Sequence, residues 1–283
     1  MKHILTTLTM LLCLHCGAQQ ISSPRSSAEA DRQGAALLMV HFGTTIDKTR
    51  TNTIDAINDK ARQAFPQMKV VEAYTSRTVM KRLAGKAILK DTPTDALLRL
   101  RADGYRSISV QPTFIIDGRE MDQLRREVEQ LRPFFDTISI GSPLLYSIED
   151  CQQVCNVLAD RHPANAKKHE HVLFVGHGTK GPATALYSQL DYMLHANGHP
   201  NHHVATIEGY PTLQTVTARL KALQAKSVTL VPLLFVAGDH ATIDIDVEWK
   251  EALESEGFIV NTVIEGLGEV PEIQQLYLEK IKN

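Results

Sequence analysis

Short apolar runs alternate with amphipathic stretches along most of the chain. Eight runs rich in β-branched residues predict buried strands at residues 36–40, 69–73, 107–111, 137–141, 171–175, 203–207, 227–231 and 259–263. Apolar residues recur with helical spacing between them, at residues 51–64, 94–102, 120–132, 148–160, 183–196, 215–223 and 246–256. Strands that alternate with helices are typical of βαβ units, so the pattern predicts parallel sheets covered by helices.

The two halves of the chain resemble each other in detail. Residues 95–112 align with residues 215–232 under one shift, each running from a helical pattern into a strand that ends in proline. Residues 40–44 (VHFGT) likewise match residues 175–179 (VGHGT). We therefore predict an α/β protein of two similar halves, each a four-stranded parallel sheet flanked by helices. Because parallel sheets bind ligands beyond the carboxyl ends of their strands, we expect a cleft between the halves.

Composition narrows the class of protein. The chain has 283 residues, of which 43% are hydrophobic, which is enough for two cores. The 30 basic and 32 acidic residues are nearly balanced and form no block of five like charges, so we expect no nucleic-acid partner. No apolar run reaches the roughly 20 residues of a membrane-spanning helix, so we expect no transmembrane segment. The oligomeric state stays open, with a homo-oligomer among the alternatives.

The first residues have the features of a secretion signal. Lys2 precedes an apolar run over residues 4–14 and then small residues, which predicts a signal peptide over residues 1–18. We therefore expect an exported protein that resides in the periplasm. Cys16 offers an alternative, a lipid anchor in the outer membrane, although His15 is bulkier than the small residue that such processing usually needs.

The rest of the chain divides into three parts. Residues 19–34 are polar and rich in Ser, which predicts a tether. Residues 35–145 form the predicted N-terminal half, and residues 146–283 form the C-terminal half. Cys151 and Cys155 lie four residues apart in a helical stretch of the C-terminal half. We interpret them as two half-buried side chains on one helix face, in preference to a disulfide or a metal pair.

Potential metal ligands follow three apolar runs of the C-terminal half. They are His177, Glu208 and His240. Two imidazoles and a carboxylate bind a borderline divalent ion such as Co²⁺, Fe²⁺, Ni²⁺ or Zn²⁺ and leave coordination positions open. Any one of these residues alone could be an ordinary loop residue. Three of them on successive strand ends favour a metal site.

The duplication assigns partners to these residues in the N-terminal half. When the two halves are aligned, His177 matches Phe42, and His240 matches Glu120. Glu120 would face the same cleft, where its carboxylate could attract a cation or take up a proton. The alternative is a first-turn helix residue that interacts with the helix macrodipole.

Other histidines gather near the predicted strands of the C-terminal half. His199, His202 and His203 precede one strand, and His169 and His171 lie at the start of another. Such a group could bind haem or a metal. We favour a solvated loop for all five.

Six motifs carry a resemblance to a known family. They are residues 41–44 (HFGT), 73–76 (AYTS), 176–178 (GHG), 208–211 (EGYP), 237–241 (AGDHA) and 266–269 (GLGE). With them, the chain from about residue 35 onward resembles the anaerobic sirohydrochlorin cobaltochelatases of the CbiK type, in the class II chelatase superfamily with protoporphyrin ferrochelatase. The resemblance implies insertion of Co²⁺ into sirohydrochlorin without ATP. The ligand types leave Fe²⁺ or Ni²⁺ open as alternative metal substrates. The resemblance also implies that His177, Glu208 and His240 bind the metal.

The implied chemistry assigns roles to these residues. Metal insertion strips water from the cation and removes two pyrrole protons, so neutral imidazoles serve first as ligands and then as bases. His177 and His240 are therefore the predicted catalytic residues. The macrocycle needs an apolar floor and partners for its carboxylates. The predicted macrocycle contacts are Phe42, Phe114 and Glu120, with Leu144, Leu145, Leu234 and Arg77 as further candidates.

Two positions depart from the family pattern. The family commonly has His where this chain has Phe114, and Ser where this chain has His41, so one cleft imidazole is absent and another lies nearby. Together with the predicted export, these changes keep a second hypothesis open, an exported haem-binding protein, free or lipid-anchored, that captures haem or removes its iron. A two-lobed binding protein for another small ligand is a third hypothesis.

Overall fold

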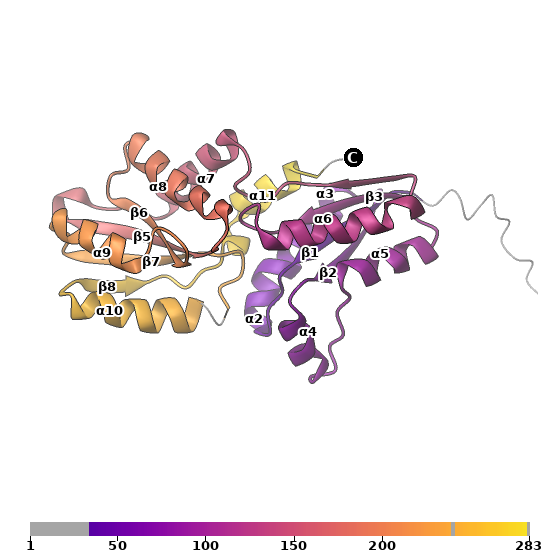
Figure 1. Cartoon of the computed structure of the whole chain (residues 1–283), viewed down its shortest axis with the longest axis horizontal. Coiled ribbons are helices and arrows are strands. Elements are labelled where there is room, and N and C mark those ends of the chain that lie inside the picture. The colour runs from indigo at the N-terminus through magenta and orange to yellow at the C-terminus, as the bar shows by residue number, and fades with distance from the viewer. Residues whose placement is uncertain (1–33, 239–240, 282–283) are drawn as a thin grey trace, which may run out of the picture.

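Two four-stranded parallel sheets lie side by side in the computed structural model, which describes residues 34–238 and 241–281 (Figure 1). The first sheet has the order β2-β1-β3-β4 and the second the order β6-β5-β7-β8. The strands are β1 Ala36–His41, β2 Lys69–Tyr74, β3 Ser107–Pro112, β4 Thr137–Ile140, β5 Glu170–Gly178, β6 His202–Glu208, β7 Ser227–Leu233 and β8 Ile259–Thr262. The eight predicted strands and the predicted division into two similar sheets are confirmed.

Helices cover both sheets. In the first half they are α2 Asp47–Arg50, the π-helix η1 Thr51–Asp55, α3 Ala56–Ala64, α4 Arg77–Ala84, α5 Pro93–Ala102, α6 Arg119–Leu131 and the short 3₁₀ turn η2 Arg132–Phe134. In the second half they are α7 Ile148–Arg161, η3 Ala166–Lys168, η4 Pro182–Thr184, α8 Ala185–Ala196, α9 Leu213–Ala222, the π-helix η5 Ala241–Trp249, α10 Lys250–Ser255, η6 Leu267–Glu269 and α11 Pro271–Glu279. The seven predicted helical patterns are confirmed. None of the described helices is long and apolar enough to cross a membrane.

Strand register shows how closely the second half repeats the first. Val40 of β1 pairs with Ala73 and Pro112 on its two sides. Val175 of β5 pairs in the same way with Ala205 and Pro232. Pro112 and Pro232 therefore occupy equivalent positions, as the sequence alignment predicts.

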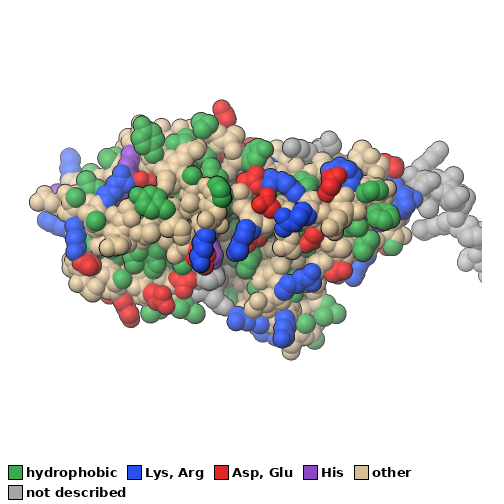
Figure 2. All heavy atoms as spheres, viewed as in Figure 1, with side chains coloured by type: hydrophobic (Ala, Val, Ile, Leu, Met, Phe, Trp, Pro, Cys, Tyr) green, Lys and Arg blue, Asp and Glu red, His purple; other side chains and the backbone are tan. Residues whose placement is uncertain are grey.

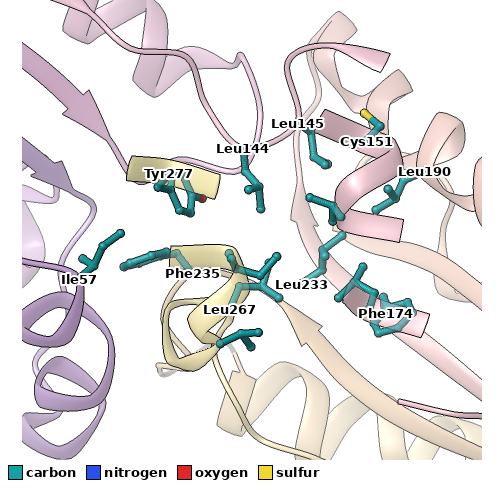
Figure 3. Packing of buried hydrophobic residues seen from close by; sticks show 14 of the residues in the cluster. Ile57, Leu144, Leu145, Cys151, Phe174, Leu190, Leu233, Phe235, Leu267 and Tyr277 are labelled. Atoms are coloured by element: carbon teal, nitrogen blue, oxygen red, sulfur yellow. The ribbon is translucent and has the colours of Figure 1, made fainter. Parts of the chain in front are cut away.

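The hydrophobic core runs through both halves. Side chains of a strand point alternately to its two faces, so Leu37 and Met39 pack on one face of β1 and Leu38 on the other. The cluster that holds Leu37 and Met39 continues across the boundary into the second sheet. Figure 3 shows residues of this cluster from both halves around Phe235 and Tyr277. The two halves thus share one continuous apolar core.

The C-terminal helix strengthens this connection. Tyr277 of α11 is fully buried, and its hydroxyl donates to the carbonyl oxygen of Phe114 at 3.1 Å, just beyond the end of β3. Lys60 of α3 donates to the carbonyl oxygen of Pro271 at 3.0 Å. A helix from the end of the chain therefore packs against the loop after a strand of the first sheet.

Cys151 and Cys155 are free thiols. The prediction that they form no disulfide is confirmed. Both are fully buried rather than half-buried, because α7 packs between α8 and α11. Burial raises the pKa of the Cys155 thiol to about 12, so it is unreactive at neutral pH.

Candidate functional site

A cavity of about 530 Å³ lies between the two halves, at the carboxyl ends of the strands. This volume is in the usual range of small-molecule sites, roughly 300–1,000 Å³. The polar and apolar side chains that line it include Phe42, Ser76, Arg82, Thr113, Phe114, Arg119, Glu120, His177, Tyr187, Glu208, Leu234 and Phe235. Figure 2 shows Lys and Arg side chains on either side of the hollow between the halves. The cleft that the sequence predicts is confirmed.

His177 stands near the end of β5 and lines this cavity. Its Nδ1 lies 3.2 Å from the carbonyl oxygen of Gly178. A carbonyl oxygen can only accept, so Nδ1 carries the proton of this hydrogen bond and Nε2 carries the lone pair. Histidines that bind metals commonly donate their other N–H to an acceptor in this way. The ring is therefore set up to use Nε2 as a ligand or a base.

Glu208 ends β6 and lies next to His177 because the two strands pair there. Gly178 pairs in register with Glu208. Gly178 has φ +77°, and a Cβ added to it would lie 1.7 Å from the carbonyl oxygen of Glu208. Only glycine permits this approach. The close contact explains why glycine comes directly after His177, and it places an imidazole and an exposed carboxylate on adjacent strand ends.

His240 lies outside the described residues, so its predicted roles as metal ligand and base stay predictions. Gly238, two residues earlier, lines the cavity.

The opposite wall of the cavity comes from the first half. Phe42 is 45% exposed and Phe114 is 8% exposed, and both line the cavity. Glu120 lines it as well, and it also lies in the first turn of α6. Both interpretations of Glu120 are therefore compatible with its position. The predicted site residues that the structure describes come together in one cavity, and their chemical roles stay predictions.

Three of the further macrocycle candidates are wrong. Leu144 and Leu145 are fully buried in the core and are absent from the cavity wall (Figure 3). Arg77 is also absent from the wall, which contains Arg82 and Arg119 instead. Arg82 lies on α4, a helix that the sequence interpretation missed. Helical spacing from Ser76, whose hydroxyl accepts from the backbone N–H of Val79, was the signal that could have identified it.

His41 lies beneath the cavity wall rather than in it. Its ring is fully buried, with Nδ1 3.0 Å from the Thr113 hydroxyl oxygen and Nε2 3.1 Å from Asn58 Oδ1. The Asn58 amide donates in turn to Glu72 at 2.8 Å. Burial lowers the pKa of His41 to about 4, although Glu72 and the hydrogen bond to Asn58 act to raise it. Describing His41 as a cleft imidazole was therefore wrong, because Thr113 separates it from the cavity.

The solvated-loop interpretation is also wrong for three histidines of the second half. His171 and His202 are 4% exposed and His203 is fully buried, because all three side chains lie on strands. His169 is half-buried in a turn, and His199 is half-buried in a loop.

The fold and the strand-end residues define an α/β protein of the chelatase class, with two repeated halves and a cleft between them. The chain belongs to the cobalt chelatase (CbiK) family, whose model matches residues 35–283. The resemblance found in the sequence is therefore confirmed.

Two relatives and two solved structures illustrate this similarity. The chain is 34% identical to the sirohydrochlorin cobaltochelatase of Salmonella typhimurium, over 86% of this chain and 93% of the relative. It is 32% identical to the sirohydrochlorin cobaltochelatase CbiKC of Nitratidesulfovibrio vulgaris, over 87% and 88%. SirB from Bacillus subtilis with Fe³⁺ has a TM-score of 0.61 at 15% identity, over 87% of this chain and 94% of that one. The sirohydrochlorin chelatase SirB from Bacillus subtilis subspecies spizizenii, in complex with cobalt, has a TM-score of 0.60 at 14% identity, over 88% and 94%. At these identities the two structures show a shared fold.

Proposed function

We propose that this protein is a chelatase that inserts Co²⁺ into sirohydrochlorin without ATP. The observation that carries the proposal is the pairing of His177 and Glu208 on adjacent strand ends, opposite the exposed ring of Phe42. One wall of the cavity thus offers metal ligands, and the other offers an apolar surface. Membership of the cobalt chelatase family and the activity of the two relatives support the same reaction.

The metal side acts on Co²⁺ as a substrate. His177 Nε2 and the Glu208 carboxylate replace part of the water around the ion, and the carboxylate offsets its charge. Open coordination positions let the pyrrole nitrogens take the ion over. His240 is the third proposed ligand.

The macrocycle side consists of aromatic and aliphatic groups with cationic groups beside them. Phe42 and Phe114 form an apolar wall for the face of the ring system, and Leu234 of the second half also lines the cavity. Arg82 and Arg119 lie on the same cavity wall, where a guanidinium can pair with a carboxylate of the substrate. This combination suits a flat, polycarboxylated tetrapyrrole.

Proton removal falls to the second half. Two pyrrole protons leave when the metal enters, and a base must lie within hydrogen-bonding reach of them. His177 Nε2 carries no proton in the neutral ring, because the hydrogen bond to the carbonyl oxygen of Gly178 holds the proton on Nδ1. His177 therefore acts as a ligand first and takes up one pyrrole proton once the pyrrole nitrogens have replaced it, and His240 is the proposed base for the other proton.

The test is the anaerobic absorbance of sirohydrochlorin mixed with Co²⁺ and the purified protein. The wild type should give catalytic turnover, which His177→Ala should abolish. His169→Asn is the matched control, since it removes a half-buried imidazole from a turn outside the cavity lining. Turnover that survives in His177→Ala, or that is absent from the wild type, contradicts the proposal. Fe²⁺ added in place of Co²⁺ ranks the two metals as substrates.

The haem-capture hypothesis gains no support. It depended in part on His41 as an additional cleft imidazole, and this ring is fully buried beneath Thr113. The relatives that establish the family are cobaltochelatases.

Export is a separate proposal. Lys2 and the apolar run over residues 4–14 support a cleaved signal peptide and a periplasmic protein. Cell fractionation and the N-terminal sequence of the purified protein provide the test, with an N-terminus at Gln19 as the expected result. A lipid on Cys16 would instead establish an anchored form, and an uncleaved cytoplasmic protein would contradict export.

A further inference from the structure

We propose a second site for a divalent metal ion, formed by Asp191, His195 and His203 of the C-terminal half. Each residue offers one ligand atom, and the three atoms lie within 4.8 Å of one another. The first two residues are one turn apart on α8, and the third is the second residue of β6. Glu208 at the other end of β6 lies about 17 Å away along the strand, from five residue rises. The second site is therefore separate from the cleft.

The imidazole of His195 has its tautomer set by its surroundings. Nε2 lies 2.7 Å from the carbonyl oxygen of His202, which can only accept, so Nε2 carries the proton. Nδ1 then bears the lone pair, and it accepts a hydrogen bond from Arg219 at 3.2 Å. Donation of the other ring N–H to a backbone carbonyl is the usual support of a metal-binding imidazole.

The tautomer of the His203 imidazole is also set by its surroundings. One of its nitrogens, Nε2, lies 2.9 Å from His171 Nδ1, and the other, Nδ1, is buried without a hydrogen-bond partner. If His171 donated, the unpartnered nitrogen of His203 would be a buried N–H with no acceptor. Donation by His203 instead leaves a bare lone pair there, which costs less. A fully buried, unpartnered lone pair is what a metal ligand requires.

The guanidinium of Arg219 bridges two of the proposed ligands, Asp191 and His195. Asp191 accepts from the backbone N–H of Val204 through Oδ1 and from the Arg219 guanidinium through Oδ2, at 2.9 and 2.6 Å. The same guanidinium donates to His195. Arg219 thus bridges the carboxylate and the imidazole with a positive charge. Its side chain is 44% exposed, so the head group can move into solvent when a divalent ion takes its place.

The ligand set defines the class of metal. Two imidazole nitrogens and one carboxylate suit Co²⁺, Ni²⁺ or Zn²⁺, whereas Mg²⁺ and Ca²⁺ prefer oxygen ligands. Three protein ligands leave at least one position to water.

The test measures Co²⁺ alone by titration calorimetry, in a His177→Ala, His240→Ala variant whose cleft lacks its imidazoles. This variant should still bind one Co²⁺ per chain, and adding His195→Gln should abolish binding. His199→Gln is the matched control, a nearby half-buried histidine outside the cluster, and it should leave the affinity unchanged. No Co²⁺ binding in the cleft variant, or equal losses with His195→Gln and His199→Gln, would overturn the proposal.

An independent variant removes no ligand. Arg219→Met eliminates the competing charge and should strengthen Co²⁺ binding by at least about tenfold, since two cations repel each other at this range. Thermal unfolding without metal checks that the variant folds cooperatively. Unchanged or weaker binding in a folded Arg219→Met variant would show that Asp191, His195 and Arg219 form only an ion-pair network, and would overturn the site.

Discussion

The two halves share a scaffold and differ in the side chains at the ends of their strands. Strand order and register are the same, with Val40 and Val175 as equivalent positions. Counted from these residues, Phe42 of the first half corresponds to His177 of the second. The first half therefore presents an aromatic ring where the second presents an imidazole. The scaffold sets where a side chain emerges, and the residue at that point decides its chemistry.

A second pair of equivalent positions shows the same division. Ala73 and Ala205 pair with Val40 and Val175, so Ser76 corresponds to Glu208. The Ser76 hydroxyl accepts a hydrogen bond from the backbone N–H of Val79 and caps α4. Glu208 is exposed and lines the cavity. The first half thus uses this position to cap a helix, and the second half has a cavity-lining carboxylate there, which we propose as a metal ligand.

The largest expected effect comes from substituting Glu208, and Ser76 provides the comparison. Glu208→Gln removes the charge that offsets Co²⁺, and it should lower insertion by about 10³-fold, roughly 4 kcal/mol. Ser76→Ala should cost about 1 kcal/mol of stability through the lost cap, with turnover retained. Anaerobic turnover and urea unfolding measure the two effects. Equal losses of turnover in both variants would show that Glu208 is no more important for insertion than Ser76, its equivalent in the first half.

Buried imidazoles provide the next contrast, through pH. The folded-state pKa of His41 is about 4, below the ordinary value of 6.5, because burial disfavours its charged form. The unfolded chain therefore binds the proton first as the pH falls. The contribution of neutral His41 to the free energy of unfolding is fully present above pH 6.5. It is lost as the pH falls from 6.5 to 4, and the loss amounts to about 3 kcal/mol.

The variant His41→Gln isolates this contribution. Glutamine has no charge to gain, so the difference between wild type and variant in unfolding free energy should change by about 3 kcal/mol between pH 7 and 4. His203 in the second half also has a lowered pKa. Because His203 is present in both the wild type and the variant, its contribution cancels in the difference. A difference that is constant with pH would mean that the pKa of His41 is the same in the folded and unfolded states.

The sequence predicted the scaffold better than the depth of individual side chains. Every residue of β1 is buried, so its apolar run was easy to recognise. The rule that histidines favour the surface failed at His203, because the strand passes beneath Arg219 and α8. Leu144 and Leu145 are apolar whether they line a cavity or fill a core, and only the packing of the C-terminal segment decides between these roles. Arg82 was missed because the start and phase of the short helix α4 were not recognised.

Glycine at one strand end provides a smaller contrast between the halves. His41 corresponds to Gly176, and a Cβ added to Gly176 would lie 2.2 Å from the ring of Tyr187. The second half thus fills with a tyrosine ring the space that the first half fills with an imidazole. Gly176→Ala should cost about 2 kcal/mol of stability, from forced repacking. Gly181→Ala is the control, since its Cβ would meet nothing closer than 3.7 Å, and urea unfolding should detect no comparable loss there.

The smallest expected effect concerns the hydrogen bonds that join the halves. The hydroxyl of Tyr277 donates within a fully buried environment to the carbonyl oxygens of Phe114 and Thr113, at 3.1 and 3.2 Å. Tyr277→Phe keeps the ring and removes this donor, so it should cost about 1 kcal/mol. Tyr192→Phe is the control, because Tyr192 is 73% exposed and its hydroxyl can bond to water.

Urea unfolding of Tyr277→Phe, followed by both near-UV and far-UV circular dichroism, also tests whether the halves are independent. Because the core around Phe235 and Tyr277 is continuous, both signals should shift together in a single transition (Figure 3). Two separated transitions would show that each half is a folding unit of its own, with stability that does not depend on the shared core. A single transition would mean that the repeated halves, although similar in register, fold only as a pair.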